Sequence, residues 1–417
     1  MIINSLLVTD AYKINMMQVV LHQFNRDIVK WAFKCRNEDV KFTPNMITRI
    51  RKEVDHYCTL RFTEDELEWL KKNFTWLTDD FIDYLRRWQP RRNEILINEN
   101  FIQAYNNCGL AIEAHGTELS TMMYEIAILA IANEVYYAEK YGDGALDIEF
   151  QKSTMEKFSK LRRSIDENEA DYCEDYKNSH PYDIGTFSEF GLRRRLSANM
   201  QDWLIKFIVD QKIPGFVGTS NVYLAKKYGV KAIGTQAHEF FMLQQGHFER
   251  NPAYSNMFAM KAWRKEYETQ LGIALTDTIG TEVFLKDFGL TDANSFSGVR
   301  HDSGNPFEWG ELMIAHYKKL GINPKTKTLL FSDSLNFEKA TKIRAAFKDR
   351  INVAFGIGTY LAGVQNVPAL NIVMKLVEVN GRPVAKLSNT PGKGMCKDTA
   401  YEEYLRRTID WRLKFGK

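Results

Sequence analysis

Cysteine is scarce in this chain, and long apolar runs are missing. The 417 residues include five cysteines, an odd number without a C-x-x-C pair. This pattern excludes a zinc ribbon and a disulfide framework, and it predicts reduced thiols in a cytoplasmic protein. The longest apolar stretch, 126–132, is far too short to span a membrane. The start lacks a basic segment and is interrupted by Asp10, so we expect no signal peptide.

A strong excess of charge is also absent. The net charge of +3 is too small to indicate nucleic acid as the main partner. The sequence has no internal repeat, low-complexity tract or G-x-x-x-x-G-K-[ST] loop, which argues against a repeat protein and a P-loop site. A chain of this length with 44% hydrophobic residues is expected to form two globular domains.

From about residue 180, short apolar runs alternate with helical stretches. This alternation predicts a parallel sheet, and about seven or eight such units favour an irregular α/β barrel over an open sheet. The predicted strands cover 182–187, 215–217, 232–234, 271–275, 297–299, 328–332 and 352–356. The predicted helices cover 193–212, 221–228, 257–268, 281–288, 306–320 and 336–347.

The N-terminal part reads as a separate α/β domain, with Thr63 and Glu66 forming a helix cap. Near the other end, 373–379 and 383–387 flank Asn380-Gly381, which predicts a hairpin with a type I′ turn. We expect this hairpin to return to the N-terminal domain. The predicted fold class is α/β, a TIM-like irregular barrel with an N-terminal α/β domain completed by the C-terminal hairpin. The predicted divisions are 1–140 for the N-terminal domain, 141–370 for the barrel, and 371–417 for a hairpin and helix that pack back on the N-terminal domain.

Acidic residues follow three of the predicted barrel strands. Asp277, Asp302 and Asp333 come just after strands, and Arg300 lies two positions before Asp302. Any one aspartate could simply cap a helix. Three of them at one barrel mouth, beside a cation, favour a ligand site. Carboxylates suit ribose hydroxyls or Mg²⁺, and arginine suits phosphate, so the pattern predicts a sugar phosphate.

Glycines and a histidine follow other predicted strands. Gly356, Gly358 and Thr359 close the last strand, where backbone N–H groups can approach a phosphate; a plain tight turn is the alternative. His238 could be a base, a phosphate ligand or a phosphoryl acceptor. Its spacing alone slightly favours a hydrogen-bonded structural histidine.

An aromatic ring and a basic cluster follow the first barrel strand, at Phe190 and 193–195. Arginine is poorly placed for the dipole at a helix start, so it could answer an anionic ligand. A solvated helix face is the other interpretation.

Together these segments resemble nicotinate phosphoribosyltransferase of the bacterial and fungal, ATP-coupled type II group. The family makes nicotinate mononucleotide and pyrophosphate from nicotinate and phosphoribosyl pyrophosphate, with coupled ATP hydrolysis, in NAD salvage. The resemblance implies an irregular barrel, ATP and Mg²⁺ as cofactors, and a homodimer with a shared active site. The matching segments run in order at 7–13, 189–195, 216–221, 234–239, 299–304, 331–333, 355–359 and 386–388.

The resemblance also implies a role for each residue. Phe190 and Tyr12 would sandwich the nicotinate ring, with Tyr12 supplied by the neighbouring subunit. Arg193 and Arg300 would contact anionic groups. His238 matches the histidine that the family phosphorylates from ATP, which reverses the preference drawn from spacing.

The remaining implied contacts lie on the phosphoribosyl side. Asp277 and Asp302 would bind the ribose side and its Mg²⁺, and Asp333 would contact the substrate. The 5′-phosphate would be cradled by Gly356, Gly358 and Thr359.

The choice of base is implied at Ser220, with Thr219 beside it in the substrate site. Relatives that use nicotinamide have aspartate at this position, which accepts from an amide and repels a carboxylate. A serine hydroxyl can donate to the carboxylate of nicotinate, so we predict nicotinate over nicotinamide.

Two rival functions remain open. A quinolinate-type phosphoribosyltransferase would need more cations for a dicarboxylate and no ATP-linked histidine. A non-catalytic sugar-phosphate-binding barrel would not need the acids, cation, glycine turn and histidine together.

Overall fold

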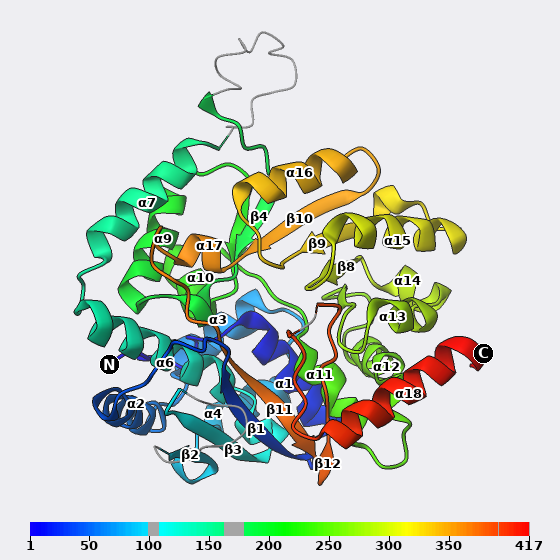
Figure 1. Cartoon of the computed structure of the whole chain (residues 1–417), viewed down its shortest axis with the longest axis horizontal. Helices are drawn as coiled ribbons and strands as arrows, with labels where there is room; N and C mark the ends of the chain where they lie inside the picture. Colours follow the sequence, from blue (N-terminus) through cyan, green and yellow to red (C-terminus); the bar gives the residue numbers. More distant parts are fainter. Residues whose placement is uncertain (99–107, 162–178, 391, 417) are drawn as a thin grey trace.

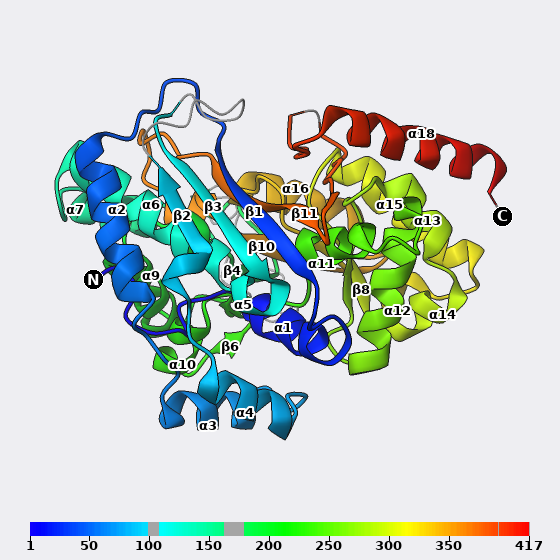
Figure 2. The same ribbon diagram turned by 90° about the horizontal axis from the view of Figure 1, so that it is seen from below.

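The computed structural model describes residues 1–98, 108–161, 179–390 and 392–416, and it contains two sheets (Figures 1 and 2). The larger sheet is parallel, with strand order β6-β5-β4-β10-β9-β8-β7. Its strands are β4 (Thr186–Glu189), β5 (Phe216–Thr219), β6 (Lys231–Ala232), β7 (Ile273–Leu275), β8 (Gly298–His301), β9 (Thr328–Phe331) and β10 (Asn352–Ile357).

The strand order is that of a barrel with one open seam. β4, β5 and β6 lie side by side in chain order, and β10 pairs with the other side of β4. β6 and β7 are the two edges, and the Thr235 hydroxyl crosses towards β7 by donating to the Ile273 carbonyl at 2.9 Å. The predicted irregular α/β barrel is therefore confirmed, and each predicted strand overlaps an observed one.

Helices follow the barrel strands, and all but the last of them connect one barrel strand to the next (Figure 1). They are α9 (Ala198–Asp210), α10 (Val222–Tyr228), α11 (His238–Leu243), α12 (Ser255–Tyr267), α13 (Thr281–Asp287), α14 (Leu290–Ser295), α15 (Pro306–Lys319), α16 (Phe337–Phe347) and α17 (Thr359–Ala362). The helix predicted from residue 193 was wrong at its start. Residues Leu192–Arg194 form a 3-10 turn, and α9 begins later because Ser197 caps it by accepting from the Met200 N–H.

The smaller sheet is antiparallel, with order β12-β11-β1-β3-β2. β11 (Ile372–Val379) pairs along β1 (Ile28–Cys35), so the C-terminal part of the chain completes the N-terminal sheet as predicted. Asn380 and Gly381 both have positive φ, 52° and 77°, as a type I′ turn requires. The other strands are β2 (Ile95–Asn98), β3 (Ala111–Thr117) and β12 (Arg382–Pro383).

The second hairpin strand is shorter than predicted. β12 ends at Pro383, and by Leu387 the backbone N–H donates to the Thr278 carbonyl of the barrel instead of to β11. Ion pairs of Lys386 with barrel carboxylates favour this departure. We call residues 384–390 and 392–396 the C-terminal strap.

The C-terminal helix was also predicted in the wrong place. α18 (Thr399–Phe415) packs on the barrel beside α13, not on the N-terminal domain (Figure 2). Its buried Arg412 pairs with Asp287 and donates to the Ala253 carbonyl at 2.6 Å. A buried arginine needs such partners, and the barrel provides them.

The N-terminal helices complete the molecule. They are α1 (Ala11–Gln23), α2 (Pro44–Tyr57), α3 (Glu64–Asn73), α4 (Asp79–Arg87), α5 (Glu118–Thr121), α6 (Tyr124–Tyr141) and α7 (Asp147–Ser159). The predicted cap at Thr63 with Glu66 is confirmed. One apolar core extends through both sheets, with α6 buried along most of its length. No helix in the described ranges is long and apolar enough to cross a membrane.

Candidate active site

A large cavity of about 1360 Å³ lies at the carboxyl ends of the barrel strands. Side chains that follow β4, β5, β6, β8, β9 and β10 line it, as expected for a barrel active site. The start of α1, the end of β1, the start of β11 and the C-terminal strap supply much of the remaining wall. The cavity therefore joins the barrel to the N-terminal sheet.

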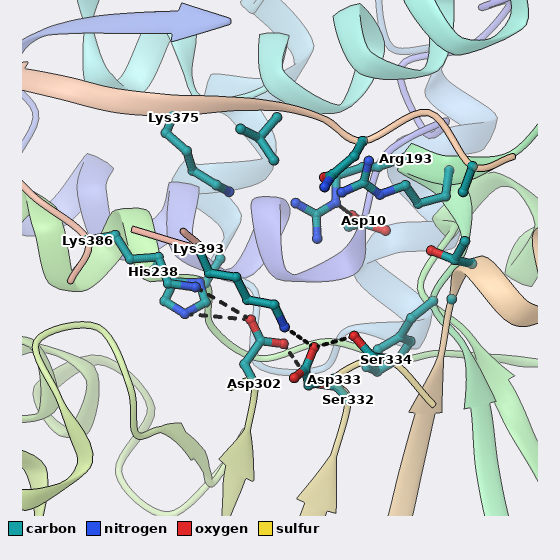
Figure 3. Close-up of a pocket in the computed structure, with 18 of the residues that line it drawn as sticks. Asp10, Arg193, His238, Asp302, Ser332, Asp333, Ser334, Lys375, Lys386 and Lys393 are labelled. Carbon is teal, nitrogen blue, oxygen red and sulfur yellow. Dashed lines mark hydrogen bonds and ion pairs between the residues drawn. The ribbon is translucent and has the colours of Figure 1, made fainter. Parts of the chain in front are cut away.

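A histidine and two carboxylates meet on one wall. His238 Nε2 lies 2.9 Å from Asp277 Oδ1. It also lies 3.6 Å from Asp302 Oδ2 (Figure 3). Asp277 is buried behind the lining and also accepts from the Ser303 hydroxyl, whereas Asp302 lines the cavity. Burial lowers the pKa of His238 to about 4, and the nearby Lys386 ammonium adds to this effect. The imidazole is therefore neutral at physiological pH.

The two segments predicted to grip a sugar phosphate form one network. Arg300 donates to Asp302 Oδ1 at 3.0 Å and to the Ser332 hydroxyl at 2.7 Å. Ser332 in turn donates to Asp302 at 2.9 Å. Burial alone would raise the pKa of Asp302, but Arg300, His238 and Lys386 outweigh it and hold this pKa well below the ordinary range. The carboxylate is thus ionised, as binding of hydroxyls or a cation requires.

The strap contributes cations that the sequence did not predict. Lys386 Nζ lies 3.6 Å from Asp277 and 3.9 Å from Asp302, and Lys393 pairs with Asp333 (Figure 3). Lys375, from β11, also lines the cavity. For Lys375 the sequence does contain a signal. A lysine inside the apolar run of β11 needs a buried partner.

The predicted base site lies at another part of the same cavity. Phe190, Arg193, Ser220 and Tyr12 all line it, together with Asp10. Arg193 is held by Glu125 at 3.2 Å and lies 3.8 Å from Asp10. The Ser220 hydroxyl donates to Asp10 Oδ1 at 2.6 Å. The single hydroxyl proton of Ser220 is therefore used in the bond to Asp10 and is not donated to a ligand. Arg193 and Lys375 are the cavity groups suited to attract a carboxylate.

Tyr12 reaches the cavity of its own chain. It follows Asp10, whose backbone forms a bridge with Asn221 after β5. This bridge ties the start of α1 to the barrel. Tyr12 and Phe190 line one cavity within the single chain, and the supply of Tyr12 by a neighbouring subunit stays a prediction.

Some predicted site residues lie behind the lining. Gly358 and Thr359 line the cavity, but Gly356 does not. A Cβ on Gly356 would lie 2.3 Å from the Phe190 ring, so this glycine makes room for the aromatic wall. Thr219 is fully buried and its hydroxyl donates to Glu189 at 2.6 Å. Gly356 and Thr219 support the site from behind its lining.

Comparison with known proteins decides the family. The model of the nicotinate phosphoribosyltransferase N-terminal domain matches residues 7–133, and that of the nicotinate phosphoribosyltransferase family matches residues 186–412. The chain belongs to the nicotinate phosphoribosyltransferase family. It is 42% identical over 412 residues to the nicotinate phosphoribosyltransferase of Acinetobacter baylyi, covering 98% of this chain and 96% of that one.

Solved structures of the family share the fold. A nicotinate phosphoribosyltransferase from Vibrio cholerae matches with a TM-score of 0.88 and 34% identity, over 98% of this chain and 94% of that one. One from Porphyromonas gingivalis matches with a TM-score of 0.84 and 29% identity, over 98% and 100%. Membership of the nicotinate phosphoribosyltransferase family makes the chain a phosphoribosyl-transferring enzyme of NAD biosynthesis.

Proposed function

We propose that this cavity transfers the phosphoribosyl group of phosphoribosyl pyrophosphate to nicotinate, forming nicotinate mononucleotide and pyrophosphate with coupled ATP hydrolysis. The observation that carries the proposal is the division of one cavity into two anion-binding parts. Arg193 and Lys375 both pair with Glu125, whereas Arg300 and Lys386 lie beside Asp302 and Lys393 pairs with Asp333. No observation favours a quinolinate-type enzyme or a non-catalytic binding barrel.

The chemistry is a displacement at the ribose C1. The pyridine nitrogen of nicotinate supplies the electron pair for the new bond, and the C1–oxygen bond breaks with its electrons leaving on pyrophosphate. Cations such as Arg300, Lys386 and Lys393 would stabilise that charge as it develops. Positioning of the two substrates provides the rest, so no protein nucleophile attacks carbon.

Mg²⁺ fits part of the predicted ligand set. One ligand atom each from His238, Asp277 and Asp302 lies within 4.8 Å of the others. Asp277 already forms hydrogen bonds with His238 and Ser303, so Asp302 is the carboxylate that would hold the ion. When bound, the ion would neutralise charge on the leaving pyrophosphate.

His238 is the proposed acceptor of a phosphoryl group from ATP. A neutral ring nitrogen attacks the γ-phosphorus, ADP leaves, and water later releases inorganic phosphate. The low pKa of His238, about 4, supports this role because the neutral form carries the required lone pair. Asp277 would hold the ring and neutralise the charge that develops on it.

Labelled ATP tests the histidine. We expect the native protein to incorporate phosphate from γ-labelled ATP, and His238→Ala to incorporate none while retaining some ATP-independent transfer. His56→Ala, on α2 and outside the cavity lining, is the matched control and should label normally. Full labelling of His238→Ala would show that another residue accepts the phosphoryl group.

The preferred base is proposed to be nicotinate. Arg193 and Lys375 attract a carboxylate, and Arg193 lies close enough to Asp10 to offset its charge. Competition between nicotinate and nicotinamide tests this preference, and equal use of both bases would contradict it.

We further propose a cytoplasmic homodimer, although each cavity already contains both aromatic rings. No disulfide links the four cysteines within the described ranges, which suits a reducing compartment. On α18, Tyr404, Trp411 and Phe415 are 46%, 58% and 70% exposed and offer apolar surface to a second copy. Sedimentation velocity of the native chain and of Trp411→Glu tests the assembly.

A further inference from the structure

Four buried polar side chains form a closed ring behind the base site. Glu189, at the end of β4, accepts from the Thr219 hydroxyl at 2.6 Å and from Gln201 Nε2 at 3.2 Å. The Gln201 carbonyl oxygen accepts from Asn221 Nδ2 at 3.0 Å, and the Asn221 backbone N–H donates to Thr219 Oγ1 at 3.1 Å. All four are at most 1% exposed, and none lines the cavity.

The ring holds the two loops that carry the base-site residues. Phe190 directly follows Glu189, and Ser220 lies between Thr219 and Asn221. Glu189 also accepts from the Gly191 N–H at 2.5 Å, while its backbone carbonyl accepts from the Ser220 N–H at 2.9 Å. Hydrogen bonds to Glu189 therefore hold the backbone at Gly191, directly after Phe190, and at Ser220 itself.

A carboxylate buried at this place lowers the stability of the fold, so its presence indicates a role other than packing. Glu189 is fully buried, and in the part of the chain that the structure describes no cation lies within ion-pair distance of it. Burial of such a group without an ion pair is unfavourable. Its two oxygens instead accept from three donors on three different segments, namely Gly191, Gln201 and Thr219.

We propose that Glu189 is a positioning residue for base recognition, which fixes the spacing between the Phe190 wall and the Ser220 loop. The inference rests on the base site proposed above. An acceptor-only group satisfies all three donors at once. In a glutamine the NH₂ group would face either the Gly191 N–H and the Gln201 NH₂, which cannot accept, or the Thr219 hydroxyl, which would have to change from donor to acceptor, so the attachment of one of the two loops would weaken.

Steady-state kinetics of Glu189→Gln and Thr219→Val test this role. We expect Glu189→Gln to raise KM for nicotinate about tenfold and to reduce the preference for nicotinate over nicotinamide, because displaced loops weaken binding of the base. KM for phosphoribosyl pyrophosphate should stay within about twofold, since its contacts lie elsewhere. Thr219→Val should act in the same direction by about threefold. The double variant should raise KM by less than the product of the two single effects, because the two side chains bond each other.

A buried carboxylate outside the cavity lining provides the matched control. Glu66, on α3, accepts from the Thr63 N–H at 2.8 Å, and a glutamine can keep this cap, so Glu66→Gln should leave both KM values unchanged. A general loss of stability would instead lower the active fraction of every variant equally. Should Glu189→Gln not fold, Thr219→Val still carries the test.

Phe190→Ala separates failure of this inference from failure of the base site itself. If Phe190→Ala raises KM for nicotinate but neither Glu189→Gln nor Thr219→Val does, the positioning role is wrong. If Phe190→Ala has no effect on that KM, the base site was assigned to the wrong residues. A rise in KM for phosphoribosyl pyrophosphate as large as that for nicotinate would also overturn the inference.

Discussion

Lys386 places a positive charge between the two carboxylates of the phosphoribosyl side. Its ammonium lies 3.6 Å from Asp277 and 3.9 Å from Asp302, at distances that leave it available to a bound anion. It also helps to keep the pKa of His238 low. One lysine thus influences both the pyrophosphate contacts and the protonation of the histidine.

Replacing Lys386 with methionine should weaken binding of phosphoribosyl pyrophosphate. We expect its KM to rise about tenfold, the usual loss for one charge-assisted contact, with KM for nicotinate little changed. Initial-rate kinetics with each substrate varied in turn measure both values. Lys397→Met, which removes an exposed lysine paired with Glu113 just beyond the strap, should behave like the native protein. Equal changes in Lys386→Met and Lys397→Met would contradict the assignment.

Glu125 binds three cations from three elements. It lies 2.8 Å from Lys13, 2.8 Å from Lys375 and 3.2 Å from Arg193, and it is fully buried. Lys375 and Arg193 line the cavity. A single carboxylate on α6 therefore holds both cations that we assign to the base.

Glu125→Gln should reduce both stability and base binding. Leaving buried cations without their partner costs about 3 kcal/mol or more, which chemical denaturation measures. Burial already lowers the pKa of Lys375, and Glu125 opposes that effect. Without Glu125 the pKa falls further, so Lys375 loses its charge at a lower pH. KM for nicotinate should then begin to rise at a lower pH than in the native protein. Unchanged stability and an unchanged pH profile would contradict this role.

At the scale of elements, β10 and the loop after β4 can pack closely because residue 356 is a glycine, which has no side chain. Gly356 on β10 faces the Phe190 ring, and a Cβ there would lie 2.3 Å from two ring carbons. Such contact is far shorter than van der Waals distance, so the ring has to move.

Gly356→Ala should therefore impair base binding without touching any substrate directly. We expect KM for nicotinate to rise several-fold, because overpacking typically costs about 1–3 kcal/mol. Gly321→Ala is a poor control because Gly321 has φ 72°. Gly289→Ala is better, since a Cβ there meets open space and its φ is negative. Native-like KM in Gly356→Ala would show that the Phe190 ring can shift freely.

The elements themselves were largely predictable, because their signals are local. Alternating apolar runs located every barrel strand, and Asn380-Gly381 located the turn before β12. The errors have two different causes. α9 begins later than predicted because of a local signal, the cap that Ser197 makes by accepting from the Met200 N–H. The buried pair of Arg412 with Asp287 draws α18 to the barrel, and this distant partner is not visible in a local pattern.

At the scale of the whole molecule, the site is built from parts that are far apart in the sequence. Strand ends of the barrel supply His238, Asp302 and Ser220, and these were predictable because barrel sites form there. Lys386 and Tyr12 come from opposite ends of the chain. Their approach depends on β11 joining the N-terminal sheet and on the path of the strap, so sequence pattern alone did not reveal how they meet.

The central claim is that this cavity joins nicotinate to the phosphoribosyl group and couples the reaction to ATP through His238. The most direct test follows product formation from nicotinate, nicotinamide or quinolinate with phosphoribosyl pyrophosphate and Mg²⁺, with and without ATP, in the native chain and in His238→Ala. We expect nicotinate mononucleotide and pyrophosphate as the main products, with stimulation by ATP only in the native chain. Preferential use of nicotinamide or quinolinate, or equal ATP stimulation of His238→Ala, would contradict the account.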